Sequence, residues 1–209
     1  MRLVAESFAW PFRHASPATW AIGILTVLLL PILFIPLLGY AIAATRAADQ
    51  GATGPPDWRL SLRLLSDGFW TALVIVVTVL PFAIALNPLA AGLHWLHEPY
   101  AHVVAFFVLA LFWGLVALLL LPHATAAFAS SGEPRDLFNA AASVRGIRAD
   151  FVTWNVVAAA IVTSWAIAVA CVGLLCVGLV PGVFYAILVS AHAAATLHRK
   201  TAGQDISAR

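Results

Sequence analysis

Long apolar runs without charge alternate along the chain with short polar interruptions. A helix needs about 20 apolar residues to cross a hydrocarbon core of about 30 Å, and several runs reach that length. Short segments of strictly alternating hydrophobicity, typical of a membrane β-barrel, are absent from the sequence. The pattern therefore predicts an all-α, polytopic membrane bundle with about five transmembrane helices. These spans are predicted at about 19–45, 69–86, 101–121, 151–177 and 182–197.

The composition supports a membrane protein. Hydrophobic residues make up 63% of the chain and charged residues 10%, and the mean hydropathy is +0.97. Soluble domains are roughly half apolar and about a quarter charged. With 209 residues the chain predicts one integral membrane domain, 1–209. The formal net charge of +2 is too small to indicate a nucleic-acid partner.

The two longest polar interruptions, 54–70 and 132–151, have the apolar spacing of amphipathic helices. Each contains a proline near its start, which suits the first turn of a helix. We therefore expect two cytoplasmic interfacial helices that lie along the membrane surface, where arginines are attracted to anionic headgroups. The expected surface for lipid or a protein partner consists of Trp58, Arg59, Arg63, Arg135, Arg145 and Arg148.

The order of span, polar loop, proline, amphipathic helix and span occurs twice, in units of about 19–86 and 101–177. An even number of spans per unit predicts a parallel pseudo-repeat, related by an axis along the membrane normal. The last span, 182–197, lies outside both units.

The positions of lysine and arginine predict the orientation. Five spans leave Arg2 and Arg13 on the side of the N-terminus and the other nine Lys and Arg residues on the opposite side. Cytoplasmic loops carry an excess of positive charge. The N-terminus is therefore expected outside and the C-terminus in the cytoplasm.

Catalytic chemistry has little support in the sequence. None of the nine acidic residues falls within a predicted span, which disfavours proton-coupled transport of the usual kind. Nucleophile elbows, phosphate loops and the zinc-protease motif are all absent. We therefore expect no enzymatic activity.

Histidines are the main candidates for ligand binding. His94, His97 and His102 lie close together in the 87–102 region, where they could bind a divalent metal or act as ordinary interface residues. His123 and His192 lie in or beside predicted spans and are candidate axial ligands of a haem. Hydrogen bonding within the bundle is the alternative for both.

Pro31 and Pro36 fall in the first predicted span and are expected to kink it near the bilayer centre. The carbonyls freed by such a kink could form a solute site, or the kink could serve helix packing alone.

The segments FAWPF, TWAIGILTVLL, PLLGY, PPDWRLSLRLLSDGFWTALV and VLPFAIAL resemble an uncharacterised prokaryotic membrane-protein family catalogued as domain of unknown function 4013. The resemblance is best over about residues 8–86. It implies a multi-span bundle with a surface helix between spans, in a prokaryotic cytoplasmic (inner) membrane, and it implies no reaction. The matching positions are Pro11, Phe12, Trp20, Gly39, Tyr40, Pro56, Trp58, Gly68 and Pro81.

Three functions are compatible with these patterns. The first is a non-enzymatic scaffold or accessory subunit that contacts membrane lipids, another membrane protein or a second copy of the chain. The second is a transporter of small solutes or lipids, and the third is a membrane protein that binds haem or a metal through histidine.

Overall fold

A computed structural model describes residues 2–14, 16–171 and 178–207 of the chain, and these residues form helices and connecting segments without strands. The predicted all-α bundle is confirmed, and five helices are long and apolar enough to cross a membrane: α3, α4, α5, α7 and α8. The elements in chain order are α1 (Arg2–Ala9), η1 (Trp10–Phe12), α2 (Pro17–Leu28), α3 (Leu30–Asp49), α4 (Leu62–Gly92), α5 (Glu98–Ser131), η2 (Pro134–Phe138), α6 (Ala140–Ala149), α7 (Phe151–Ala170) and α8 (Leu179–Ser207). The last part of the fourth predicted span, 172–177, lies outside the described residues.

Helix α8 is the central helix of the bundle and contacts α1, α2, α3, α5 and α7. Phe184 and Leu188 of α8 are fully buried and pack with Leu37 and Tyr40 of α3. Ala193 and Leu197 pack on the other side against α7 and α1. Small residues along α8 let these neighbours approach closely, as is usual between membrane helices.

The first predicted span, 19–45, is wrong in its bounds, because these residues form two helices that fold back on each other and the helix long enough to span is α3. The aromatic ring of Phe184 lies 5.5 Å from that of Trp20 and 5.9 Å from that of Tyr40. One straight helix would separate Trp20 from Tyr40 by about 30 Å. The chain turns at Leu29 and again at Leu33, where the backbone dihedrals are not helical.

The predicted kink at Pro31 and Pro36 is confirmed, and it is sharper than expected. Proline lacks an amide proton and its ring clashes with the carbonyl four residues earlier, so the two prolines, both within α3, favour the interruptions at Leu29 and Leu33. The tip of the hairpin, including Leu28 and Ile32, is apolar and exposed. Helix α2 has 12 residues and is about 18 Å long, too short to cross a membrane alone.

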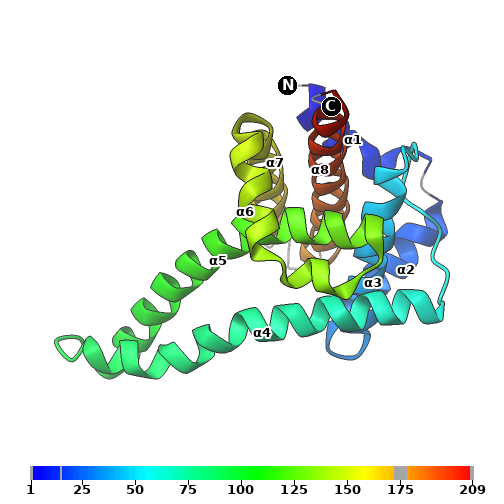
Figure 1. Cartoon of the computed structure of the whole chain (residues 1–209). Coiled ribbons are helices and arrows are strands. Elements are labelled where there is room, and N and C mark those ends of the chain that lie inside the picture. Colours follow the sequence, from blue (N-terminus) through cyan, green and yellow to red (C-terminus); the bar gives the residue numbers. More distant parts are fainter. Residues whose placement is uncertain (1, 15, 172–177, 208–209) are drawn as a thin grey trace.

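Helices α4 and α5 form a long hairpin that extends away from the other helices (Figure 1). We call the part from Ile75 to Leu119 the α4–α5 arm. Within it the two helices contact each other, for example where Trp113 donates a hydrogen bond to the carbonyl of Thr78. Most large apolar side chains of the arm are exposed.

The first predicted surface helix is also wrong. Residues 55–61 form neither helix nor strand, and the helix that follows, α4, begins at Leu62 and continues without interruption to Gly92. Contacts with α3 hold this segment in place, since Tyr40 donates a hydrogen bond to the carbonyl of Pro56 and its ring stacks on Trp58. In the second interruption the short helices η2 and α6 do occur before α7. The proposed pseudo-repeat stays a prediction.

The N-terminal segment lies beside the connection between α3 and α4, whereas the sequence analysis placed a span between them. The indole of Trp10 donates a hydrogen bond of 3.0 Å to the carbonyl of Ala52. A Cβ placed on Gly54 would lie 1.8 Å from the carbonyl oxygen of Arg13, which shows how closely these segments pass. Helix α1 of this segment also packs against α8 (Figure 1).

Candidate functional site

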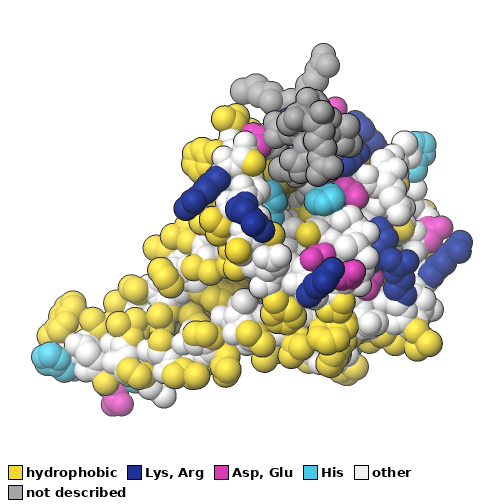
Figure 2. All heavy atoms as spheres, in the orientation of Figure 1, with side chains coloured by type: hydrophobic (Ala, Val, Ile, Leu, Met, Phe, Trp, Pro, Cys, Tyr) yellow, Lys and Arg dark blue, Asp and Glu magenta, His cyan; other side chains and the backbone are white. Residues whose placement is uncertain are grey.

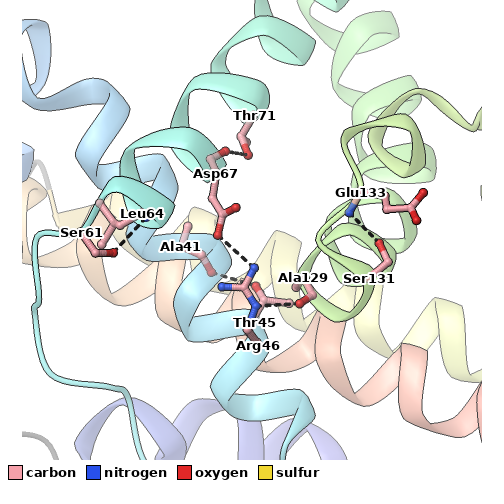
Figure 3. Close-up of polar contacts among 10 residues, drawn as sticks. All are labelled: Ala41, Thr45, Arg46, Ser61, Leu64, Asp67, Thr71, Ala129, Ser131 and Glu133. Atoms are coloured by element: carbon pink, nitrogen blue, oxygen red, sulfur yellow. Dashed lines mark hydrogen bonds and ion pairs between the residues drawn. The ribbon is translucent and has the colours of Figure 1, made fainter.

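A group of polar contacts lies where α3, α4 and α5 meet, as Figure 3 shows. The Arg46 guanidinium lies 2.9 Å from the Asp67 carboxylate, and its Nε donates a 2.8 Å hydrogen bond to the carbonyl of Ala129. The Arg46 and Asp67 side chains are only 15% and 8% exposed. This ion pair therefore joins three helices across a largely buried interface.

The local sequence explains why Ala129 needs a partner. It lies in the last turn of α5, whose final carbonyls have no amide partner within the helix. The amide of Glu133, four residues on, is bound instead by the Ser131 hydroxyl. Arg46 supplies the missing donor, and its positive charge suits the negative end of the helix dipole.

Close helix crossing brings the pair together. A Cβ on Gly39 of α3 would lie 1.9 Å from the carbonyl oxygen of Leu64, and one on Gly68 of α4 would lie 2.0 Å from that of Ile35. The two glycines therefore let the backbones of α3 and α4 touch, in the manner of small-residue contacts in membranes.

Sequence reasoning missed this ion pair, because it placed Asp67 just before a span, in a surface helix. Asp67 is instead buried within α4. The sequence signal for its burial is its position one residue before Gly68, because a glycine lets a second helix approach closely.

Tyr40 of α3 holds the segment 55–61, which precedes α4, by a hydrogen bond and a ring contact. Tyr40 donates a 2.8 Å hydrogen bond to the carbonyl of Pro56, and its ring stacks on Trp58 with 4.0 Å between centroids. Trp58, predicted to face lipid or a partner, instead packs inward.

A hollow of about 130 Å³ lies between this segment, α3 and the start of α4. Its lining includes Arg46, Arg59, Arg63, Asp57 and Asp67. Two of the arginines predicted as a surface, Arg59 and Arg63, are thus brought together. We call this hollow the arginine hollow.

The other predicted surface arginines lie elsewhere. Arg145 and Arg148 are exposed on α6. Arg135 is exposed on η2 and forms an ion pair with Glu133.

His123 lies in a second hollow, of about 170 Å³, that it shares with His198 and Asp136. Its ring packs on α6 at Gly146, where an added Cβ would lie 2.7 Å from Cε1 of the imidazole. Nε2 of His123 is buried without a hydrogen-bond partner among the described residues. His198 lies 3.4 Å from the Asp49 carboxylate.

His192 has different neighbours. Its Nδ1 lies 3.0 Å from the Ser7 hydroxyl, and its ring is 5.3 Å from that of Trp10. These contacts join α8 to the N-terminal segment. They correspond to hydrogen bonding within the bundle, the alternative to haem ligation given for His192. His192 does not line the hollow that contains His123, so the candidate haem ligands do not meet there.

His94, His97 and His102 lie near the turn at the end of the α4–α5 arm and are exposed. Nδ1 of His94 and of His102 each lies within hydrogen-bond distance of a backbone carbonyl. The described residues bring no three His, Cys, Asp or Glu side chains together around a position for a metal ion. The geometry therefore gives the predicted metal site no support.

Pro31 and Pro36 lie at the apolar turn of the α2–α3 hairpin. Neither residue lines the arginine hollow or the His123 hollow. The solute site predicted beside them stays a prediction.

Asp150 caps the start of α7 and accepts a 3.0 Å hydrogen bond from the amide of Thr153. Hydrogen bonds from the side chain and the backbone of Thr153 hold the pKa of Asp150 below its ordinary value, and the positive charge of Lys200 adds to this effect. The carboxylate is therefore the form that the fold prefers.

The comparison with protein families gives one match. Residues 22–189 match the family described as protein of unknown function (DUF4013). The chain belongs to this family. The match confirms the resemblance seen at residues 8–86 and extends it through α7 and into α8. No curated protein and no solved structure matches the chain.

Proposed function

We propose that this DUF4013 protein is a non-enzymatic scaffold or accessory subunit of a prokaryotic cytoplasmic membrane, and that the α4–α5 arm is its contact element. The observation that carries the proposal is the exposure of the arm. Phe107, Leu111 and Phe112 of α5 are each about two-thirds exposed. A helix that is apolar on most sides is covered by lipid or by a membrane protein.

The length of the arm suits a membrane. Within the arm, residues 75–92 of α4 and 98–119 of α5 are about 27 Å and about 33 Å long at about 1.5 Å per residue. A hydrocarbon core is about 30 Å thick. The arm can therefore present its exposed apolar side chains to another membrane protein within the bilayer.

The distribution of charge supports a cytoplasmic location for the polar end. Lys and Arg gather away from the arm on the face drawn in Figure 2. The turn at 93–97 contains neither residue type. With the N-terminal segment on the same side as the α3–α4 connection, the positive-inside bias becomes stronger than five separate spans implied. We therefore propose that both ends of the chain lie in the cytoplasm.

Native mass spectrometry of the chain extracted from its own membranes tests the proposal. We expect a reproducible added mass that matches another polypeptide. The variant with Phe107→Ala and Leu111→Ala should lose that mass, while Val162→Ala with Val169→Ala on exposed α7 should keep it. A bare chain of 22.2 kDa or its plain homo-oligomer would contradict the accessory role and favour a transporter.

A further inference from the structure

The arginine hollow has a distinctive strip along one wall. Arg59, Ser61 and Arg63 line the hollow, while the alternate residues Leu60 and Leu62 point elsewhere and are 77% and 87% exposed. Arg59 and Leu60 lie in the non-helical segment before α4, Ser61 caps the helix, and Leu62 and Arg63 lie in its first turn. The strip is therefore cationic on one face and apolar on the other.

Some of the charged side chains that line the hollow have polar partners, whereas two of the arginines form no ion pair with a described residue. Arg46 and Asp67 are paired with each other, and Asp57 accepts a 3.3 Å hydrogen bond from Ser16. Arg59 and Arg63 have no ion-pair partner among the described residues. A guanidinium nitrogen of Arg63 lies 3.8 Å from the Cβ position of Gly132, at the end of α5.

We propose that the arginine hollow binds the phosphate of an anionic phospholipid headgroup. Arg59 and Arg63 would hold the phosphate, since guanidinium groups donate paired hydrogen bonds to its oxygens. Leu60 and Leu62 would enter the adjacent acyl layer, which accounts for two large apolar side chains left exposed beside two arginines. Free phosphate has the same headgroup chemistry but gives the leucines no role.

Substitution of Asp57 should change lipid binding in the direction opposite to substitution of the arginines. Its carboxylate lines the same hollow and repels a phosphate. Asp57→Asn should therefore strengthen binding, whereas loss of the arginines should weaken it. A purely structural role for these residues would not give opposite effects.

The experiment measures retention of phosphatidylglycerol and of phosphatidylcholine by the full chain in detergent, using native mass spectrometry. We expect the chain to bind phosphatidylglycerol more tightly than phosphatidylcholine. Arg59→Gln with Arg63→Gln should weaken its binding about 30-fold, which corresponds to about 1 kcal/mol for each arginine near anionic lipid. Asp57→Asn should tighten it.

The matched control is Arg145→Gln with Arg148→Gln, which removes the same charge from α6 outside the hollow. This control should bind phosphatidylglycerol like the unaltered chain. An equal loss in both double variants would overturn the proposal, because general surface charge would explain the binding.

Two further outcomes would also overturn it. One is unchanged binding by the Arg59→Gln and Arg63→Gln variant in a chain that still unfolds at the normal temperature. The other is displacement of the lipid by millimolar inorganic phosphate together with unaltered binding in Leu60→Ser with Leu62→Ser, which would assign the hollow to a free anion. The mass of a protein partner is read independently in the same spectra, so failure of this site is distinct from failure of the scaffold role.

Discussion

Removal of Arg46 should destabilise the protein more than any change of an exposed charge. Arg46→Met leaves the Asp67 carboxylate, 8% exposed, without its counter-ion and leaves the Ala129 carbonyl without its donor. Breaking a buried ion pair on one side costs about 3–5 kcal/mol. Because Arg46 is 15% exposed, we expect the lower end, about 3 kcal/mol. For a chain of this length that corresponds to a fall of about 6–12 °C in the unfolding temperature.

A double-mutant cycle in detergent, followed by thermal unfolding, measures the interaction itself. Asp67→Leu alone should also destabilise, and the double variant Arg46→Met with Asp67→Leu should cost clearly less than the sum of the two. Arg135→Gln, which breaks the exposed pair with Glu133, is the control and should change stability by less than about 1 kcal/mol. Strict additivity of the two single changes would refute the ion-pair account.

Three further predictions concern local packing and protonation. Gly68→Ala should lower the unfolding temperature by several degrees because its Cβ meets backbone at 2.0 Å, while Gly114→Ala, which has open space, should not; equal effects in a thermal melt would contradict this. Gly146→Ala should displace the His123 ring and shift its NMR resonances, and an unchanged imidazole spectrum would contradict the close packing seen. Asp150, whose pKa is lowered by folding, contributes stability above its unfolded pKa of about 3.9 and loses it as pH falls through the folded value, so Asp150→Asn should flatten the acid limb of the stability curve.

The number of long apolar helices could be predicted from the sequence because membrane helices are read from hydropathy and length alone. Four of the predicted spans lie within single helices over their described residues. Their ends were less predictable, since α4 and α5 extend well past the apolar runs. Apolar length gives no information on where a helix ends in a polar region.

The hairpin of α2 and α3 could not be predicted, although Pro31 and Pro36 marked its position. A proline pattern indicates where a helix is interrupted and does not indicate the angle between its two parts. The angle depends on contacts with Phe184, which lies more than 140 residues further along the chain. The predicted side of the N-terminus depends on the same segment, because one crossing more or fewer reverses the side of every preceding segment.

The polar site was only partly predictable. Arg59 and Arg63 were predicted as a cationic surface on a helix that begins after Pro56. In the structure Arg59 precedes α4, and Arg63 lies in its first turn. The pairing of Arg46 with Asp67 depends on the approach of α3 to α4 at Gly39 and Gly68, which is a tertiary contact. Sequence spacing alone does not specify such contacts.

The central claim is that the N-terminal segment lies on the same side of the membrane as α6, opposite the tip of the α4–α5 arm. Labelling of single cysteines in intact cells tests it, in a chain with Cys171→Ala and Cys176→Ala. His14→Cys and Arg145→Cys should react with a membrane-impermeant maleimide only after permeabilisation, and Trp95→Cys should react in intact cells. Labelling of His14→Cys in intact cells, together with Trp95→Cys and unlike Arg145→Cys, would contradict the account.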